Sequence, residues 1–451
     1  MRMTESIHIA NQQLQRKETS SLALAQSALG RLSDPAGEGS RTFTRVYASQ
    51  ALSAAKEADA RRKSGAQCSP IDGLPISIKD LFDVAGEVTT AGSSVLQTQP
   101  PAPADAEVVA RLKGAGAVIV GKTNMSEFAF TGVGMNPHFG TPANPYDRSR
   151  RRIPGGSSSG APVSVADGIA MAAIGTDTGG SVRIPAALCG LVGFKPTQRR
   201  IPRDGVFPLS PTLDSVGPIA RTVSCCAAVD AVLAGERYQP KPVELRSLSL
   251  AIPRNYFLDD LQAEIGRAFE SAVRKLSMAG AHVNDMVMPE VEQIAEVNSR
   301  GGISAPEAYA FHRRLGAEFS QYDPLVRERI LRGKEISAAD YLDMLNTREL
   351  LIRNFNASRS DWMFLLCPTV PIVAPEIAVL EQSPELYRRT NRLLLRNPSV
   401  VNFLDGCALT IPCHEPGSAP VGLMLIGRAM EDLRLLNAGL AVEDILARDS
   451  N

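Results

Sequence analysis

Apolar residues recur at helical spacing near the N-terminus of the chain. They lie three or four positions apart between Leu22 and Leu32, just after candidate capping residues at 19–21, and this spacing predicts a helix. An alanine-rich stretch with a polar face, over about 46–63, predicts a second helix. We therefore expect residues 1–65 to form an N-terminal helical arm.

Farther along the chain, short apolar strands alternate with helical patterns. The predicted elements are, in chain order, an extended run at 75–80, a helix at 106–114, a strand at 117–120, a helix ending at Ala166 and a strand at 168–174. Strands that alternate with helices in this way favour an α/β fold, in which helices cover both faces of one sheet.

The second half of the chain leaves this pattern and later returns to it. A Pro- and Gly-rich stretch at 205–222 predicts an irregular wrap, and charged, leucine-bearing helical patterns dominate 305–360. Further strands are predicted from Leu248 and, as short apolar runs, within 362–427. The expected organisation is the N-terminal arm, a main domain at 66–430 with a helical insertion at about 260–360, and a C-terminal helix or tail at 431–451.

The charge balance limits the classes of partner. Lysine plus arginine equals aspartate plus glutamate at 48 each, so the formal net charge is zero. This balance argues against a nucleic-acid-binding chain, although a local basic patch is compatible with it. The N-terminus lacks the apolar core of a signal peptide, and no apolar run approaches the roughly 20 residues that cross a bilayer. We expect a cytoplasmic protein that binds neither membranes nor nucleic acid.

Cysteine and histidine form no pattern typical of a metal site. The seven cysteines contain no CxxC pair, and the five histidines contain no HExxH motif. The odd cysteine count and the apolar neighbours favour reduced, packed thiols. We expect no metal and no cofactor.

Three segments carry residue types that suit nucleophilic catalysis: GLPISIKD (73–80), GGSSSG (155–160) and GTDTGGSVR (175–183). Ser181 follows two glycines at the end of an apolar strand, where N–H groups can converge on one point. Each segment also has a plain structural alternative. For GLPISIKD the alternative is that Lys79 lies at a strand end and extends to solvent. For GGSSSG it is a flexible linker or an anion cradle, and for GTDTGGSVR it is a tight turn.

Taken together, the three segments make chemical sense. Serine is a weak nucleophile and needs a base to remove its proton. Burial lowers the pKa of lysine, so a neutral Lys79 amine could be that base without any histidine. A second serine hydroxyl both donates and accepts, and could therefore relay the proton.

These segments resemble the amidase signature family, in which a GGSSGG loop precedes a GTDxGGS nucleophile segment and a lysine lies upstream. Here Ser157 and Ser181 are 24 residues apart, and Lys79 lies in PISIKD. Further similar stretches are GKTNMSEFAF (121–130), PAALCGLVGFKPT (185–197), TLDSVGPIARTV (212–223), CPTVPIVAP (367–375) and PVGLMLIG (420–427). The resemblance covers roughly residues 65–430.

The resemblance implies both a fold and a set of catalytic residues. The fold is α/β, with a large, mixed, twisted sheet covered by helices on both faces. The resemblance makes Ser181 the nucleophile and Lys79 the base. It makes Ser157 the bridging serine, which follows a cis Gly156–Ser157 peptide bond.

The resemblance also assigns roles to the residues around the nucleophile. The expected oxyanion hole consists of backbone N–H groups of Thr178, Gly179, Gly180 and Ser181. Asp177 and Arg183 match the charged pair of the family and are expected to orient the loop, with a plain structural salt bridge as the alternative.

Two stretches depart from the family pattern. In the Gly/Ser loop, Ser159 replaces a glycine and Ala161 replaces a serine, which would strain Ser159 if that glycine has a positive φ. The stretch NFLDGCALTIPC (402–413) diverges from the usual NLxGxPAxSxP, and Asp405 in it is either a substrate contact or a buried structural carboxylate. The candidate substrate-binding residues are Thr131, Gly132, Ser158 and Asp405.

The resemblance implies an amidohydrolase that forms an acyl-enzyme on Ser181. We expect a small soluble amide as the substrate and a homodimer as the assembly. One alternative is the glutaminase subunit of a tRNA-dependent amidotransferase, which works with a tRNA-binding partner. The other is a non-catalytic protein whose Gly/Ser loops bind an anion at a helix N-terminus.

Overall fold

The structure is a computed structural model that describes residues 6–316, 318–357 and 363–447. Its strands are β1 (Phe43–Val46), β2 (Pro75–Lys79), β3 (Val118–Thr123), β4 (Ala172–Asp177), β5 (Val192–Lys195), β6 (Ser215–Ala220), β7 (Ser249–Pro253), β8 (His282–Met286), β9 (Phe364–Pro368), β10 (Cys407–Pro412) and β11 (Gly422–Gly427). Its α-helices are α1 (Ile7–Gln15), α2 (Ser21–Leu32), α3 (Gly39–Thr42), α4 (Ala48–Lys63), α5 (Glu107–Gly114), α6 (Gly160–Ala166), α7 (Arg183–Leu188), α8 (Val223–Ala234), α9 (Ala263–Met278), α10 (Glu290–Ser299), α11 (Ser304–His312), α12 (Pro324–Arg332), α13 (Ala338–Ala357), α14 (Ile377–Glu381), α15 (Pro384–Phe403) and α16 (Asp432–Ala447).

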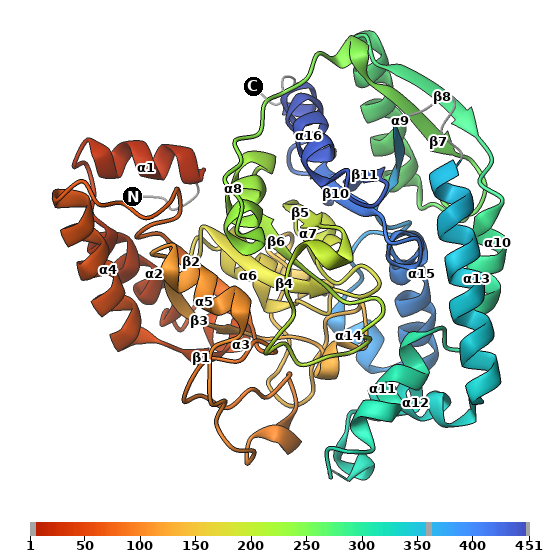
Figure 1. Cartoon of the computed structure of the whole chain (residues 1–451), viewed down its shortest axis with the longest axis horizontal. Helices are drawn as coiled ribbons and strands as arrows, with labels where there is room; N and C mark the ends of the chain where they lie inside the picture. The colour runs from red at the N-terminus through yellow and green to blue at the C-terminus, as the bar shows by residue number, and fades with distance from the viewer. Residues whose placement is uncertain (1–5, 317, 358–362, 448–451) are drawn as a thin grey trace.

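The strands described by the structure form one mixed sheet of 11 strands in the order β1-β3-β2-β4-β6-β5-β10-β11-β9-β7-β8. Strand β2 runs parallel to β3 and β4, and β7 runs parallel to β8 and β9. The other neighbouring strands are antiparallel. Helices surround the sheet, with α1, α2 and α4 at one side and α10 to α13 at the other (Figure 1). The predicted α/β class is confirmed.

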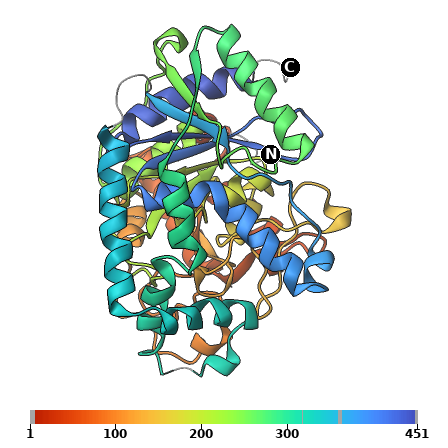
Figure 2. The same ribbon diagram turned by 90° about the vertical axis from the view of Figure 1, so that its right-hand side faces the viewer.

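Alternating residues of β4 contact two different helical layers. Ala172 and Ile174 belong to the large core cluster that includes residues of α8 and α16. Ala173 belongs to a separate cluster with residues of α6 and α7. Because successive strand residues point to opposite faces, helices cover both faces of the sheet. Figure 2 shows the long helices α13 and α15 on the side of the molecule that carries the insertion.

The predicted N-terminal helices are present. Ser20 caps α2, and its hydroxyl accepts a hydrogen bond from the N–H of Ala23. However, residues 43–46 form strand β1, which pairs antiparallel with β3 at the edge of the sheet. The expected helical arm at 1–65 therefore also contains one strand, which was not predicted because pairing with a distant strand is not visible in local helical spacing.

Two further strands lie where the sequence predicted none. Strand β6 lies within the stretch predicted to be an irregular wrap, and all six of its residues pair with β4 despite Gly217 and Pro218. Strand β8 lies within the predicted helical insertion and pairs with β7.

Strand β4 begins at Ala172 and not at Gly168, whose φ of 67° belongs to the turn after α6. In each case long-range pairing or a turn outweighed local composition.

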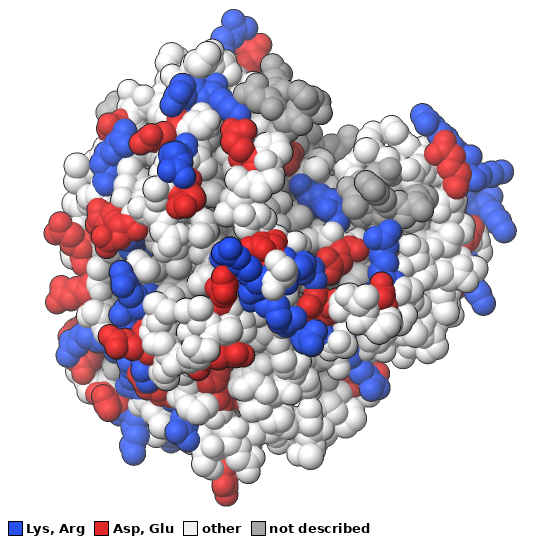
Figure 3. Space-filling model, turned by 180° about the vertical axis from the view of Figure 1, so that it is seen from behind, with Lys and Arg blue, Asp and Glu red and all other residues white. Residues whose placement is uncertain are grey.

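The distribution of charged side chains on the surface is consistent with the zero net charge. Basic and acidic side chains are interspersed on the face shown in Figure 3. Within the described ranges, no helix has the length and apolar character needed to span a bilayer.

Candidate active site

The parallel strands β2 and β4 bring two of the three sequence segments together. Ile78 is paired with Ile174, so Lys79 and Thr176 follow at the same edge of the sheet. The Lys79 side chain is fully buried. Its Nζ donates to Ser157 Oγ at 2.7 Å and to Thr176 Oγ1 at 2.9 Å. The structure thus joins the predicted base to the predicted bridging serine.

The surroundings of Lys79 favour a neutral amine. Burial lowers the pKa of Lys79 to about 7, although the carboxylates of Asp214 and Asp177 oppose this shift. Among the described residues, no carboxylate lies within ion-pair distance of Lys79 Nζ. A large fraction of the lysine is therefore unprotonated at neutral pH, as a base requires.

The Gly/Ser loop has the predicted cis peptide bond between Gly156 and Ser157. The Ser157 carbonyl accepts hydrogen bonds from the N–H groups of Ser126 and Ser159, each at 2.9 Å. Ser159 has a φ of −66° at the start of α6. The strain that would accompany a positive φ at Ser159 is therefore absent, and replacement of the glycine is compatible with this loop.

The nucleophile segment packs directly against the Gly/Ser loop. The N–H of Ser158 donates to the carbonyl of Ser181 at 3.3 Å. Among the described contacts, no hydrogen bond joins the hydroxyls of Ser157 and Ser181. Gly180 has a φ of 126°, and an added Cβ would lie 2.6 Å from Ile184 Cδ1. A glycine is therefore required immediately before Ser181.

Asp177 and Arg183 form a fully buried ion pair beside Ser181, with 2.8 Å between Asp177 Oδ1 and Arg183 Nη2. Burial opposes ionisation of Asp177, but the Arg183 guanidinium outweighs burial and lowers the pKa of this carboxyl. Asn402 of α15 completes the network. Its Oδ1 accepts from Arg183 Nη2 at 2.7 Å, and its Nδ2 donates to the Asp177 carbonyl at 2.9 Å.

The same network bears on the oxyanion-hole prediction. The N–H of Gly180 donates to Asp177 Oδ1 at 2.8 Å, so it is already used within the loop. Thr178, Gly179 and Ser181 line the adjacent cavity, whereas Gly180 does not. The geometry therefore favours the N–H groups of Thr178, Gly179 and Ser181 as candidate donors over that of Gly180.

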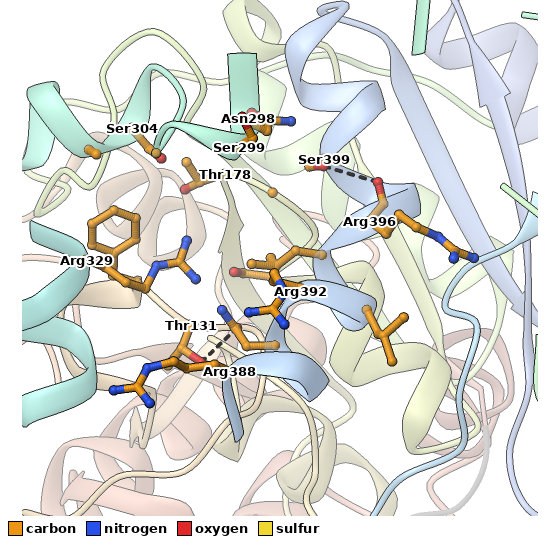
Figure 4. Close-up of a pocket in the computed structure, with 18 of the residues that line it drawn as sticks. Thr131, Thr178, Asn298, Ser299, Ser304, Arg329, Arg388, Arg392, Arg396 and Ser399 are labelled. Atoms are coloured by element: carbon orange, nitrogen blue, oxygen red, sulfur yellow. Dashed lines mark hydrogen bonds between the residues drawn. The ribbon is translucent and has the colours of Figure 1, made fainter. Parts of the chain in front are cut away.

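A cavity of about 540 Å³ lies in front of Ser181. Residues from the Ala129–Thr131 stretch and the nucleophile segment line its floor, and helices α12 and α15 contribute much of the rest. Figure 4 shows Thr131 and Thr178 together with arginines that project from these two helices. The volume of this cavity suits a small organic ligand.

Of the four candidate substrate-binding residues, only Thr131 lines this cavity. Its hydroxyl lies 2.9 Å from that of Tyr387 and donates to Asn391 Oδ1. The N–H of Gly132 donates to the same Asn391 oxygen, and the Ser158 hydroxyl is fully buried.

Asp405 also lies outside the cavity. Its Oδ2 is 4.0 Å from Arg199 Nη1, in the turn between α15 and β10. This placement supports the structural alternative for Asp405.

Sequence reasoning missed several residues of the site. Thr176, which binds Lys79, is one of several polar residues in GTDTGGS, and only the strand pairing shows which of them faces the lysine. Asp214 accepts a hydrogen bond from the Thr178 hydroxyl, and burial raises its pKa to about 6. A usable signal for Asp214 was its position in the family-like stretch TLDSVGPIARTV. Within the described ranges, His, Cys, Asp and Glu form no group of three that could hold a metal ion.

Comparisons with known proteins show which family the chain matches. A family model described as Amidase matches residues 35–436. The 2-amino-5-chloromuconic acid deaminase of Comamonas testosteroni is 38% identical over 409 residues, which cover 88% of this chain and 87% of that protein. A glutamyl-tRNA(Gln) amidotransferase subunit of Roseiflexus castenholzii is 36% identical, and the match covers 97% of this chain and 94% of that one.

Solved structures show the same architecture. The crystal structure of an amidase superposes with a TM-score of 0.87 at 32% identity, and the match covers 98% of this chain and 99% of that one. The native peptide amidase of Stenotrophomonas maltophilia superposes with a TM-score of 0.81 at 28% identity, over 97% and 96% of the two chains.

Proposed function

Since the chain belongs to the amidase signature family and is a hydrolase of amide C–N bonds, we propose that it hydrolyses a small, soluble amide through an acyl-enzyme on Ser181. The observation that carries this proposal is the buried Lys79 amine, 2.7 Å from the Ser157 hydroxyl. Lysine is rarely fully buried, and the Lys79 amine donates to two hydroxyl groups, one of them that of the predicted bridging serine.

In the proposed reaction, Ser181 Oγ attacks the amide carbonyl and passes its proton to Ser157. Ser157 at the same time passes its own proton to the neutral Lys79 amine. The C–N bond then breaks, and the proton returns through Ser157 to the leaving amine or ammonia. Water attacks the resulting ester, and the same relay removes the proton of the water.

Backbone N–H groups would stabilise the negative charge on the carbonyl oxygen in the transition state. We propose Thr178, Gly179 and Ser181 as donors, because the N–H of Gly180 already binds Asp177. Each such donor is worth about 3 kcal/mol in the transition state. The Asp177–Arg183–Asn402 network would hold these groups in position.

The rival candidate is the glutaminase subunit of a tRNA-dependent amidotransferase. The 36% identity to the amidotransferase subunit of Roseiflexus castenholzii over nearly the whole chain favours this candidate. The 38% identity to a deaminase of a small organic acid favours an enzyme that acts on a small organic substrate. Hydrolysis of simple amides by the isolated chain would support the amidohydrolase over the amidotransferase subunit. A non-catalytic anion-binding protein does not account for the Lys79–Ser157 contact.

Intact-mass analysis after treatment with a fluorophosphonate tests the nucleophile. We expect one adduct, mapped to Ser181, in the wild-type protein and none in Ser181→Ala. Lys79→Ala should slow labelling by about 100-fold or more, since the base is lost. Ammonia release from a panel of primary amides should follow the same order.

Another serine of the cavity provides the control. The Ser399 hydroxyl donates to the carbonyl of Arg396 within its own helix, so Ser399→Ala should retain the adduct. An adduct on another residue, or Ser181→Ala activity within tenfold of wild type, would refute the assignment.

A further inference from the structure

The cavity in front of Ser181 is unusually rich in positive charge for a chain with no net charge. Two carboxylates line it, Asp260 and Glu328. Against these stand the six arginines Arg329, Arg332, Arg388, Arg389, Arg392 and Arg396. All six come from two helices, α12 and α15.

Three of these arginines are held by other protein groups. Glu328 binds Arg332 at 2.8 Å and Arg388 at 2.7 Å. The guanidinium of Arg396 donates to Asn397 Oδ1 at 3.1 Å and lies over the ring of Tyr256. Both carboxylate oxygens of Glu328 are therefore used by Arg332 and Arg388, and neither forms an ion pair with Arg329.

Arg329 is different, because it is half-buried and forms no hydrogen bond or ion pair within the described ranges. Its guanidinium carbon lies 4.6 Å from the centre of the Phe130 ring, which supports the side chain from one side. Burial lowers the pKa of Arg329 to about 10, so the group still carries its charge at neutral pH. A half-buried cation without an anion is costly unless a ligand supplies the anion.

Arg392 of α15 likewise forms no ion pair within the described ranges, and it is exposed at the cavity. In Figure 4, Arg329 and Arg392 project from α12 and α15 into the space between the two helices. The planar guanidinium matches a carboxylate in a two-point contact. Apolar residues such as Leu213, Leu325 and Leu395 line the same cavity.

We propose, on the basis of the amidohydrolase function above, that the substrate is an amide that also carries a carboxylate remote from the scissile bond. Arg329 binds this carboxylate inside the cavity, and Arg392 attracts it at the entrance. The apolar lining contacts the carbon chain between the two groups, while the amide carbonyl lies at Ser181. An α-ammonium group, as in glutamine, is disfavoured because the six lining arginines outnumber the two lining carboxylates, Asp260 and Glu328.

Matched amides test this proposal. The ω-monoamides of succinic, glutaric and adipic acid carry a carboxylate at three distances from the amide. Butanamide, pentanamide and hexanamide have a methyl group in place of that carboxylate. Glutamine differs from the glutaric monoamide by its α-ammonium group. Ammonia release gives kcat and KM for each compound.

We expect the wild-type enzyme to prefer at least one acid over its methyl counterpart, and the glutaric monoamide over glutamine. Arg329→Gln should lower the ratio of kcat/KM for that acid to kcat/KM for its counterpart by at least about tenfold, mainly through KM. Arg327→Gln changes an arginine of the same helix that does not line the cavity, and should keep the ratio. Equal use of acids and methyl counterparts, or a ratio unchanged in Arg329→Gln, would overturn the proposal.

A binding measurement separates this proposal from the proposed function. Calorimetry with Ser181→Ala requires no turnover, and glutarate or the preferred acid should bind with a measurable heat that Ser181→Ala/Arg329→Gln loses. If the acid binds in this way but the wild-type protein forms no adduct at Ser181, the catalytic assignment alone would be refuted. An active enzyme in which Arg329→Gln leaves acid binding intact would refute the carboxylate site alone.

Discussion

At the scale of single residues, the protonation of Lys79 should control reactivity. Burial lowers its pKa to about 7, and only the neutral amine can accept the proton that passes through Ser157. The rate of Ser181 labelling by an uncharged fluorophosphonate should therefore rise with pH, with a midpoint near 7, and level off above it. Stopped labelling reactions read by intact mass over a pH series provide the measurement.

Asp214 provides the second arm of this test. Its carboxylate raises the pKa of Lys79, so Asp214→Asn should move the midpoint to lower pH. A rate that does not depend on pH would argue against lysine as the base, and a midpoint near the ordinary lysine pKa would argue against the lowered pKa of Lys79.

The candidates Lys79, Ser157 and Ser181 could be selected from the sequence because each lies in a short motif whose chemistry is local. Thr176 and Asn402 could not be predicted, because their roles depend on which side chains the sheet and α15 bring beside Lys79 and Asp177. Arg329 shows the same limit. Its significance depends on the lack of an ion-pair partner among the described residues and on the Phe130 ring, and neither is visible in a charged helical pattern.

At the scale of elements, helix α15 connects the cavity to the nucleophile loop. Asn402 near its C-terminus binds both Asp177 and Arg183 and is buried. Asn402→Ala would leave these groups with unmade hydrogen bonds, which costs about 1–3 kcal/mol of stability. Because Asp177 also holds the N–H of Gly180, we expect Ser181 labelling to slow by about tenfold as the loop loses its position.

The matched control is Asn397 on the same helix. Its side chain is equally buried, but it donates to the carbonyls of Phe257 and Pro368. Asn397→Ala should lower the free energy of unfolding to a similar extent and leave the labelling rate of the folded protein within about twofold. If both variants slow labelling equally, Asn402 contributes to stability only and does not position the loop.

Most strands could be predicted from apolar runs, because the central strands of this sheet are buried on both faces, as in β2, β4 and β11. The strands β1 and β8 lie at the two edges of the sheet, where one neighbour is missing and side chains are more polar. Strand β6 is central, but its glycine and proline predict a loop. Pairing along the whole of β4 stabilises it in spite of that composition.

At the scale of the whole molecule, one hydrophobic cluster contains residues from all the segments that the sequence analysis distinguished. This cluster contains Ile7 and Leu24 of the N-terminal arm, Ile330 of the insertion and Ile445 of the C-terminal helix. Within it these residues connect with core strand residues such as Ile174. Segments that share one core lose stability together. We therefore propose that the arm, main domain, insertion and C-terminal helix form one cooperative unit.

A core substitution in the arm tests this proposal far from Ser181. Leu24 is 2% exposed, and Leu24→Ala should cost about 2–5 kcal/mol through lost burial and the cavity that remains. We expect a single calorimetric transition shifted down by a few degrees, with Ser181 labelling lost at the same midpoint. Leu350→Ala on α13 removes a leucine that is 46% exposed and should leave the transition nearly unchanged. A separate low-temperature transition in Leu24→Ala, with labelling retained above it, would instead show that the arm unfolds on its own.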